Sequence, residues 1–329
     1  MFKVLLLVVS MMFIHPLLAF ANEGIVNPYQ VYTYDTLKKD LLELQGKFPS
    51  SIQVKTIGKT PFGREIYATR LGRGKQNILL IGTHHGREWM TTSLLMEMLE
   101  QYAGAYHSKK QYGPYSTGVL DDVSIWFVPM LNPDGVEIQQ GNLHRFPPHY
   151  QKKIKALNKN LDDFTRWKAN GLGVDLNRQY PAGWNELKSE PSEPSFQFYK
   201  GEAPLEAKEV KVLTNFTKKI SPLIAVPYHS SGRMIFWKYK NGVNMDRDHS
   251  LAKKVSSLTN YELDEPPDNA TGGGYTDWFI TTFKRPALTI EICPLVENTS
   301  PPLSVFHEEW ERNKYVGLLL ANEAKDIKD

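Results

Sequence analysis

The sequence has 329 residues, of which 41% are hydrophobic, and a formal net charge of +3 at pH 7. The 7 Trp, 16 Tyr and 15 Phe are spread along its whole length, which excludes a disordered chain. The sequence has no dense run of Lys and Arg, which argues against a nucleic-acid partner. One cysteine cannot form a disulfide within the chain, so an apolar core has to stabilise the fold.

The N-terminus has the pattern of a secretory signal peptide. Lys3 precedes an apolar run over residues 4–20, and Ala19 and Ala21 frame a small-residue exit before Asn22. The alternative is an uncleaved membrane anchor, but the run is barely long enough to span a bilayer and contains a proline. We expect residues 1–21 to be removed and residues 22–329 to form one domain that works outside the cytoplasm, with no later membrane segment.

The first predicted elements are a helix and an antiparallel hairpin. Asp35 begins a helical pattern with a stripe of leucines, which stops at residues 46–49. Residues 52–57 and 65–71 alternate between apolar and polar side chains, which predicts a hairpin at a sheet edge. A continuous apolar run over residues 77–82, followed by a helical pattern over residues 91–106, then indicates a strand, a loop and a helix.

The remaining elements alternate between strands and helices. A buried strand is predicted over residues 123–130, closed by the turn Asn132-Pro133-Asp134-Gly135, and residues 141–169 are polar and predict a surface segment with a short helix. Further along the chain we expect helices over 206–219, 251–259 and 305–324 and strands over 223–228 and 287–292. This order predicts an α/β fold, a single domain with a mixed, mostly parallel β-sheet flanked by helices.

Three of the predicted strands lead directly into ionisable residues. The first is followed by His84, His85 and Glu88, the second by His229, and the third contains Glu291. Ligands of open α/β sheets bind outside the carboxyl ends of the strands, so these side chains are expected to meet. Catalytic zinc takes three nitrogen or oxygen ligands and leaves one position open, a requirement that His85, Glu88 and His229 satisfy. His84 is the alternative ligand in the first segment.

Two further features admit both a structural and a functional interpretation. Glu291 lies in an apolar strand, where a carboxylate is either buried with an arginine partner or acts as a general base beside a metal-activated water. Asn177 and Arg178 are suited to bind a substrate carboxylate through the arginine fork. Asp175, just before them, either caps a turn or orients a metal-bound imidazole.

Taken together, these segments resemble the zinc carboxypeptidase family, the carboxypeptidase A type. The segment Gly82-Thr-His-His-Gly-Arg-Glu-Trp89 is similar to the first metal motif of the family, and residues 132–135 to the turn that follows it. Residues 173–178 are similar to its carboxylate-binding segment, 228–231 to the third ligand and 288–292 to the strand of the catalytic glutamate. The five motifs occur in the right order and cover nearly the whole mature chain.

The resemblance implies a zinc peptidase domain with one zinc ion, bound by His85, Glu88 and His229. Glu291 would act as the base and then as the acid, and Arg87 would help polarise the scissile carbonyl. Asn177 and Arg178 would hold a substrate carboxylate close to the scissile bond.

Three assignments from the resemblance are less closely defined by the sequence. An arginine upstream of the Asn-Arg pair is expected to stabilise the oxyanion, and we prefer Arg166 to Lys168. Tyr275 lies in the region of the substrate-gating tyrosine, and Thr276 lies where side-chain specificity is often set.

Within the family, residues 62–67, 166–170, 228–232 and 286–291 resemble bacterial γ-D-glutamyl-diaminopimelate peptidases, which cut peptidoglycan stem peptides. This implies a secreted or cell-wall-associated protein whose peptide substrate carries a second carboxylate. Arg233 is one candidate to bind that group, and a surface arginine is the alternative. Cys293 shares a strand face with Glu291 and is either a thiol near the metal or a small buried side chain.

Two other functions share these residues. One is a general exported carboxypeptidase that acts on ordinary L-peptides, which would use the same zinc and carboxylate-binding residues. The other is a catalytically inactive protein that binds wall peptides, and the presence of Glu291 argues against it because binding alone needs no base.

Overall fold

The computed structural model describes residues 24–188, 191–266 and 271–327. The predicted signal peptide, residues 1–21, lies outside the described residues. Within the described ranges, no helix has the length and apolar character needed to cross a bilayer.

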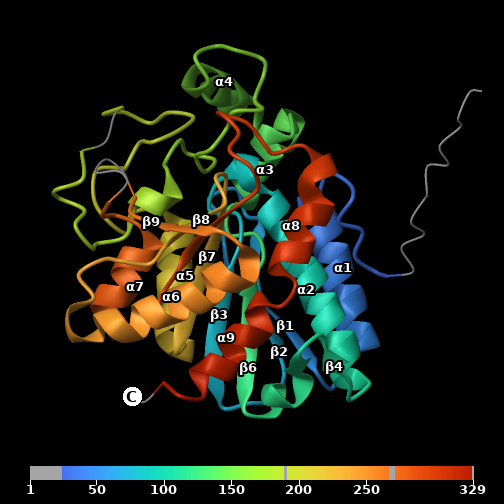
Figure 1. Cartoon of the computed structure of the whole chain (residues 1–329). Coiled ribbons are helices and arrows are strands. Elements are labelled where there is room, and N and C mark those ends of the chain that lie inside the picture. The colour runs from blue at the N-terminus through green and yellow to red at the C-terminus, as the bar shows by residue number, and fades with distance from the viewer. Residues whose placement is uncertain (1–23, 189–190, 267–270, 328–329) are drawn as a thin grey trace, which may run out of the picture.

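The described residues form an eight-stranded mixed sheet with the strand order β1-β2-β6-β3-β7-β10-β8-β9 (Figure 1). The pairs β6–β3, β3–β7, β7–β10 and β8–β9 are parallel. The pairs β1–β2, β2–β6 and β10–β8 are antiparallel. The predicted hairpin at the sheet edge is confirmed. The strands are β1 (Ile52–Lys59), β2 (Glu65–Leu71), β3 (Gln76–Ile81), β6 (Val123–Val128), β7 (Ile224–Ser230), β8 (Met234–Phe236), β9 (Glu262–Asp264) and β10 (Thr289–Ile292).

Helices cover both faces of this sheet, and a small separate hairpin is formed by β4 (Gln111–Tyr112) and β5 (Tyr115–Ser116). The α-helices are α1 (Tyr34–Lys47), α2 (Met90–His107), α3 (Pro133–Gln139), α4 (Pro148–Leu157), α5 (Lys208–Ile220), α6 (Met245–Thr259), α7 (Tyr275–Phe283), α8 (Phe306–Asn313) and α9 (Val316–Ala324). Two single-turn helices, η1 (Gly86–Glu88) and η4 (Leu176–Arg178), contribute to the site described below.

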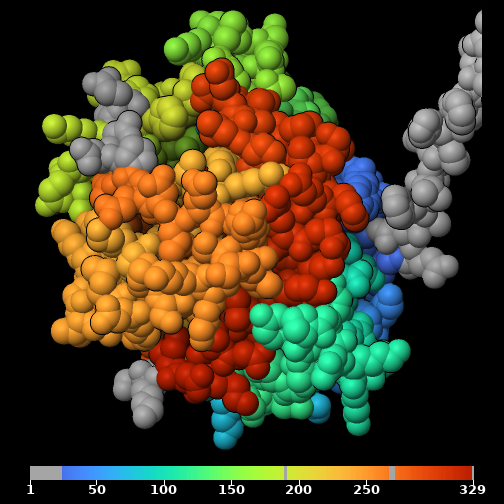
Figure 2. All heavy atoms as spheres, viewed as in Figure 1, coloured from blue at the N-terminus to red at the C-terminus, as the bar shows by residue number. Residues whose placement is uncertain are grey.

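The core has two layers because the side chains of each central strand alternate between the two faces. In β3, Ile78 and Leu80 pack into a cluster with α1, α2, α6 and α9, whereas Leu79 and Ile81 pack into a second cluster with α5 and α7. The predicted α/β fold with a mixed sheet between helices is therefore confirmed. The later part of the chain, coloured orange and red, covers most of the face shown in Figure 2.

The predicted closing helix over residues 305–324 is wrong in one respect, because the chain forms two helices there, α8 and α9. The carbonyl of Lys314 accepts a hydrogen bond from the Tyr102 hydroxyl at 2.8 Å. The Lys314 carbonyl, which lies between the two helices, is therefore bonded to a side chain. The next residue, Tyr315, has a φ of −111° and stands just before the start of α9. The apolar pattern continues across the break, which explains why the sequence predicts one helix.

Asn132 connects the loop after β3 to a second loop. Its side-chain oxygen accepts from Gly135 N at 2.9 Å and begins α3, while its Nδ2 donates to the carbonyls of His84 and Ala169 at 3.0 and 3.1 Å. The amide of Gly86 also donates to Lys168 O at 3.0 Å. The backbone around His85 is therefore fixed to the segment that carries Lys168.

Glu209, at the start of α5, is expected to make the stability of the protein depend on pH. Its carboxyl group is fully buried and accepts a hydrogen bond from Asn170 Nδ2 at 3.2 Å. Burial, together with the charge of Asp134, raises the pKa of this group to about 7. An acid whose pKa is higher in the folded than in the unfolded state binds more protons when folded, so stability is lost as the pH rises from about 4.5 to 7.

Glu209→Gln removes this loss. The difference in the free energy of unfolding, variant minus wild type, should therefore increase with pH. Above pH 7 the increase should reach at most about 3 kcal/mol. Urea unfolding at pH 5 and pH 8.5 measures the difference. A difference between variant and wild type that is the same at both pH values would contradict the assignment.

Candidate metal centre

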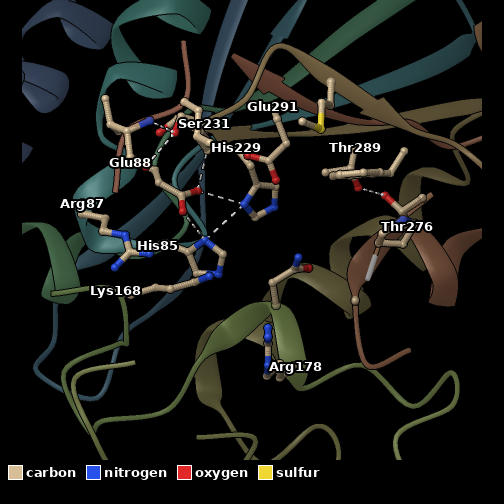
Figure 3. Close-up of a pocket in the computed structure, with 18 of the residues that line it drawn as sticks. His85, Arg87, Glu88, Lys168, Arg178, His229, Ser231, Thr276, Thr289 and Glu291 are labelled. Atoms are coloured by element: carbon tan, nitrogen blue, oxygen red, sulfur yellow. Dashed lines mark hydrogen bonds and ion pairs between the residues drawn. The ribbon is translucent and has the colours of Figure 1, made fainter. Parts of the chain in front are cut away.

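Three side chains from two distant segments of the chain converge at the carboxyl ends of β3 and β7. His85 follows β3, Glu88 belongs to η1, and His229 lies near the end of β7, which pairs in parallel with β3. Glu88 Oε1 is 2.8 Å from His85 Nδ1, Glu88 Oε2 is 2.9 Å from His229 Nδ1, and the two Nδ1 atoms are 3.2 Å apart (Figure 3). All three side chains are buried, and their ligand atoms lie within 4.8 Å of one another.

The contacts of His85 fit a metal ion bound by this donor set. His85 Nε2 is 3.0 Å from Asp175 Oδ1, and a carboxylate only accepts, so Nε2 carries the ring proton. Nδ1 is then the ring nitrogen left to bind a cation, and it faces an oxygen of Glu88 and Nδ1 of His229, which are ligand atoms too. Two imidazole nitrogens and a carboxylate are a ligand set that catalytic zinc uses.

Asp175 links the candidate ligands to two cations. Besides its contact with His85, its other oxygen lies 3.8 Å from Lys168 Nζ and 3.6 Å from Arg178 Nη1. Burial alone would raise the pKa of Asp175, but Lys168, His85 and Arg178 hold it well below its ordinary value. Both cations also lie over the ring of Phe198, with 4.9 Å from Lys168 Nζ and 5.2 Å from Arg178 Cζ to its centroid.

Glu291 lies on β10 directly beside His229. The two residues are register partners in the parallel pair of β10 and β7, so their side chains point to the same face of the sheet. Burial and the neighbouring charge of Glu88 raise the pKa of Glu291 to about 8, against the opposing effect of Lys168 and Arg87. A divalent cation on the three ligands would lower that pKa toward neutrality, where a general base has to work.

A cavity of about 570 Å³ opens over the three candidate ligands, and Figure 3 shows the side chains around it. Asn177, Arg178, Arg87, Lys168 and Thr276 line it together with Glu291. Asn177 Oδ1 accepts from Tyr275 N at 3.1 Å, which leaves the NH₂ group of Asn177 as a donor for a ligand. The hydroxyls of Thr276 and Thr289 are 2.6 Å apart and form a polar part of the wall.

Three residues that the sequence suggested for the site are held elsewhere. Arg166 does not line the cavity, because its guanidinium stacks on Phe196, 4.8 Å from the ring centroid. Tyr275 is fully buried, with its hydroxyl 3.0 Å from that of Thr217. Arg233 forms ion pairs with Glu308 and Glu309 at 2.8 and 2.7 Å.

Lys168 is the residue of the Arg166-Trp167-Lys168 segment that reaches the cavity. Burial lowers its pKa, while the carboxylates of Asp175 and Glu88 act in the opposite direction. Sequence reasoning named Lys168 but preferred Arg166, because the type of residue expected at this position is arginine.

Packing holds two other residues considered from the sequence apart from the candidate ligands. His84 does not join the candidate ligands, because its ring lies behind them, stacked 5.1 Å from the His229 ring with Nε2 3.0 Å from the Tyr180 hydroxyl. Cys293 is fully buried with Sγ 3.5 Å from Met90 Sδ, and burial raises the pKa of its thiol. It is a core side chain and does not line the cavity.

Asp175→Asn is expected to weaken metal binding by about 10- to 100-fold. The amide removes the negative charge that holds the proton on His85 Nε2, so His85 Nδ1 becomes a poorer ligand. Competition with a chromogenic chelator measures the affinity. Glu209→Gln is the matched control, because it neutralises another buried carboxylate away from the ligands, and an Asp175→Asn protein with the same affinity as this control would contradict the proposed orientation of His85.

Comparisons with known proteins agree with this geometry. Residues 37–316 match the family model described as zinc carboxypeptidase. The chain is 32% identical over 304 residues to the γ-D-glutamyl-L-diamino acid endopeptidase 1 of Lysinibacillus sphaericus, covering 90% of this chain and 73% of that protein.

Two solved structures have the same fold. Carboxypeptidase A from Helicoverpa armigera superposes with a TM-score of 0.71 at 18% identity, covering 94% of this chain and 78% of the other. The murein-tripeptide amidase from Escherichia coli O157 superposes with a TM-score of 0.51 at 17% identity, covering 85% and 94%. The chain therefore belongs to the zinc carboxypeptidase family and is a peptidase with one zinc ion as its cofactor.

Proposed function

We propose that this protein hydrolyses the bond between γ-D-glutamate and diaminopimelate in peptidoglycan stem peptides. The observation that carries the proposal is the shared cavity, in which Glu291 lies beside the three metal-ligand candidates and Arg178 lines the same space. The name of the relative from Lysinibacillus sphaericus supports the γ-glutamyl and diamino acid parts of the substrate.

His85, Glu88 and His229 would hold the zinc ion, which would supply Lewis acidity for the attack of water on the scissile carbonyl. Glu291 accepts the proton of the attacking water and then donates it to the departing amine. Its place beside His229 on the neighbouring strand allows one carboxyl group to serve both proton transfers.

Lys168 stabilises the negative charge that develops on the carbonyl oxygen. It replaces Arg166 in this role because its ammonium group lines the cavity, while Arg166 stacks on Phe196. Asp175, at 3.8 Å, favours the charged form of the buried amine.

Asn177 and Arg178 bind the carboxylate of the diaminopimelate residue on the amine side of the scissile bond. The NH₂ group of Asn177 and the fork of Arg178 are donors in one cavity, a geometry suited to a planar carboxylate. Thr276 and Thr289 line the space for the diaminopimelate side chain.

The protein works outside the cytoplasm, secreted or associated with the cell wall. The apolar N-terminal run with its small-residue exit supports export through a signal peptide at residues 1–21, which leaves residues 22–329 as the zinc peptidase domain.

The substrate is tested by incubating the zinc-loaded enzyme with L-Ala-γ-D-Glu-diaminopimelate and with ordinary L-peptides whose C-termini are free or blocked. We expect release of diaminopimelate, with little turnover of the L-peptides. Turnover of only the free L-peptides would instead identify a general carboxypeptidase and disprove the wall-peptidase function.

A further inference from the structure

Arg87 is a largely enclosed cation that lines the cavity and contacts neutral oxygens. Its Nη1 donates to the carbonyl of Arg166 at 3.2 Å, to Gln197 Oε1 at 3.0 Å and to Asn298 Oδ1 at 3.3 Å. Its own carbonyl accepts from Ser300 Oγ at 2.6 Å, so its backbone is tied to the same loop as Asn298. Among the described residues, no carboxylate forms an ion pair with this guanidinium.

The other cations of the cavity form ion pairs with carboxylates, whereas Glu88, Asp175 and Glu291 act on Arg87 only through space. Lys168 and Arg178 flank Asp175, and Lys238 pairs with Glu265. A partly desolvated guanidinium that makes no direct ion pair is costly, and a carboxylate from a ligand that contacts it would offset that cost. Arg87 is therefore suited to receive a negative charge that arrives with the substrate.

The position of Arg87 identifies the part of the substrate that it would meet. A Cβ atom on Gly274 would lie 3.5 Å from Asn177 Oδ1, so Asn177 is next to the start of α7, which carries Thr276. These residues form the amine side of the proposed site. In Figure 3, Arg87 lies on the other side of the three metal-ligand candidates from Thr276 and Thr289, which places it on the acyl side.

The acyl residue differs between the two kinds of peptide. A glutamyl residue linked through its γ-carboxyl keeps a free α-carboxylate, joined to the scissile carbonyl through its own short chain. An ordinary L-peptide has a neutral backbone amide in the corresponding region. A cation on the acyl side therefore distinguishes the γ-linked substrate by charge.

We propose that Arg87 recognises the free α-carboxylate of a γ-linked glutamyl residue and so determines specificity on the acyl side, in place of the carbonyl-polarising role that the family resemblance implies. This inference rests on the proposed function. The contacts with Gln197 and Asn298 orient the guanidinium and leave its charge available to the substrate.

A pair of substrates that differ by one group tests this role. L-Ala-γ-D-Glu-diaminopimelate carries the α-carboxylate, and the corresponding peptide with D-isoglutamine carries a neutral amide in its place. Zinc-loaded wild-type enzyme should prefer the acidic peptide by about 10- to 100-fold in kcat/KM. In Arg87→Gln this ratio should fall to about two or less, with the change mainly in KM.

Two further variants separate a specific contact from a general charge effect. Asn298→Asp places a carboxylate where an amide oxygen now contacts Arg87, so it should compete with the substrate and reduce the ratio without removing the arginine. Lys238→Gln removes another positive charge from the cavity and should keep the wild-type ratio.

The outcomes are distinct from those of the proposed function. Cleavage of both peptides with a wild-type ratio near one, or an unchanged ratio in Arg87→Gln and Asn298→Asp, overturns the role of Arg87 and leaves the wall-peptidase function standing. Failure to cleave either peptide, with turnover of ordinary L-peptides, overturns both.

Discussion

Replacement of Glu291 by glutamine is expected to reduce kcat by about a hundredfold to ten-thousandfold while leaving one zinc ion per chain. Glutamine has nearly the same shape, but it accepts no proton from the attacking water and donates none to the departing amine. The metal ligands on β3, η1 and β7 are unchanged, so zinc binding and the fold should be preserved.

The measurement is kcat on whichever peptide the wild-type enzyme cleaves, together with the zinc content of the same sample. Glu97→Gln is a suitable control, because Glu97 is a buried carboxyl on α2 whose pKa burial raises to about 7, and it does not line the cavity. A Glu291→Gln enzyme with the kcat of this control would rule out Glu291 as the proton carrier.

His229→Ala is expected to abolish both zinc retention and hydrolysis. His229 supplies one of three ligand side chains, and the two remaining donors, His85 and Glu88, are fewer than the three protein ligands that catalytic zinc uses. After dialysis against a chelator, the zinc content of the variant should fall close to zero, while circular dichroism shows the helices and strands of wild type.

His84→Gln is the informative partner of that variant, because the sequence offered His84 as an alternative ligand. Its ring bonds to Tyr180 and stacks behind His229, so we expect the variant to retain zinc. Loss of zinc from His84→Gln with retention in His229→Ala would reverse the ligand assignment.

The sequence predicts the central strands because their apolar runs are continuous or alternate, as β3 and the β1-β2 hairpin show. It also predicts the meeting of His85, His229 and Glu291, since parallel strands bring their carboxyl ends to one edge of the sheet. The strands β8 and β9 have only three residues each, which is too short for a periodic pattern, so the sequence does not predict them.

The cations of the cavity are harder to predict for a different reason. Arg166 and Lys168 flank the fully buried Trp167 in an irregular loop, where no period indicates which side chain faces the ligands. The structure resolves this through Gly86, whose amide bonds to the carbonyl of Lys168 and holds that residue next to His85. Contacts between two loops of this kind leave no pattern in a single sequence.

Tyr275 illustrates the same limit at α7. Its region of the chain suggests contact with a ligand, but its ring fills a buried space beside Tyr180, with 5.3 Å between the ring centroids. What it contributes to the cavity is its backbone amide, which orients Asn177. Backbone contributions to a site do not depend on the side chain and are therefore not visible in the choice of residue.

The central claim is that one zinc ion on these three side chains is required for hydrolysis. It is tested most directly by elemental analysis of the purified enzyme combined with an activity titration, in which the metal is stripped and zinc is added back in known amounts. We predict one zinc per chain at the start, no turnover in the stripped protein, and recovery that levels off at one added equivalent. Full turnover by the stripped protein, or a preparation that is active without bound zinc, would contradict the account.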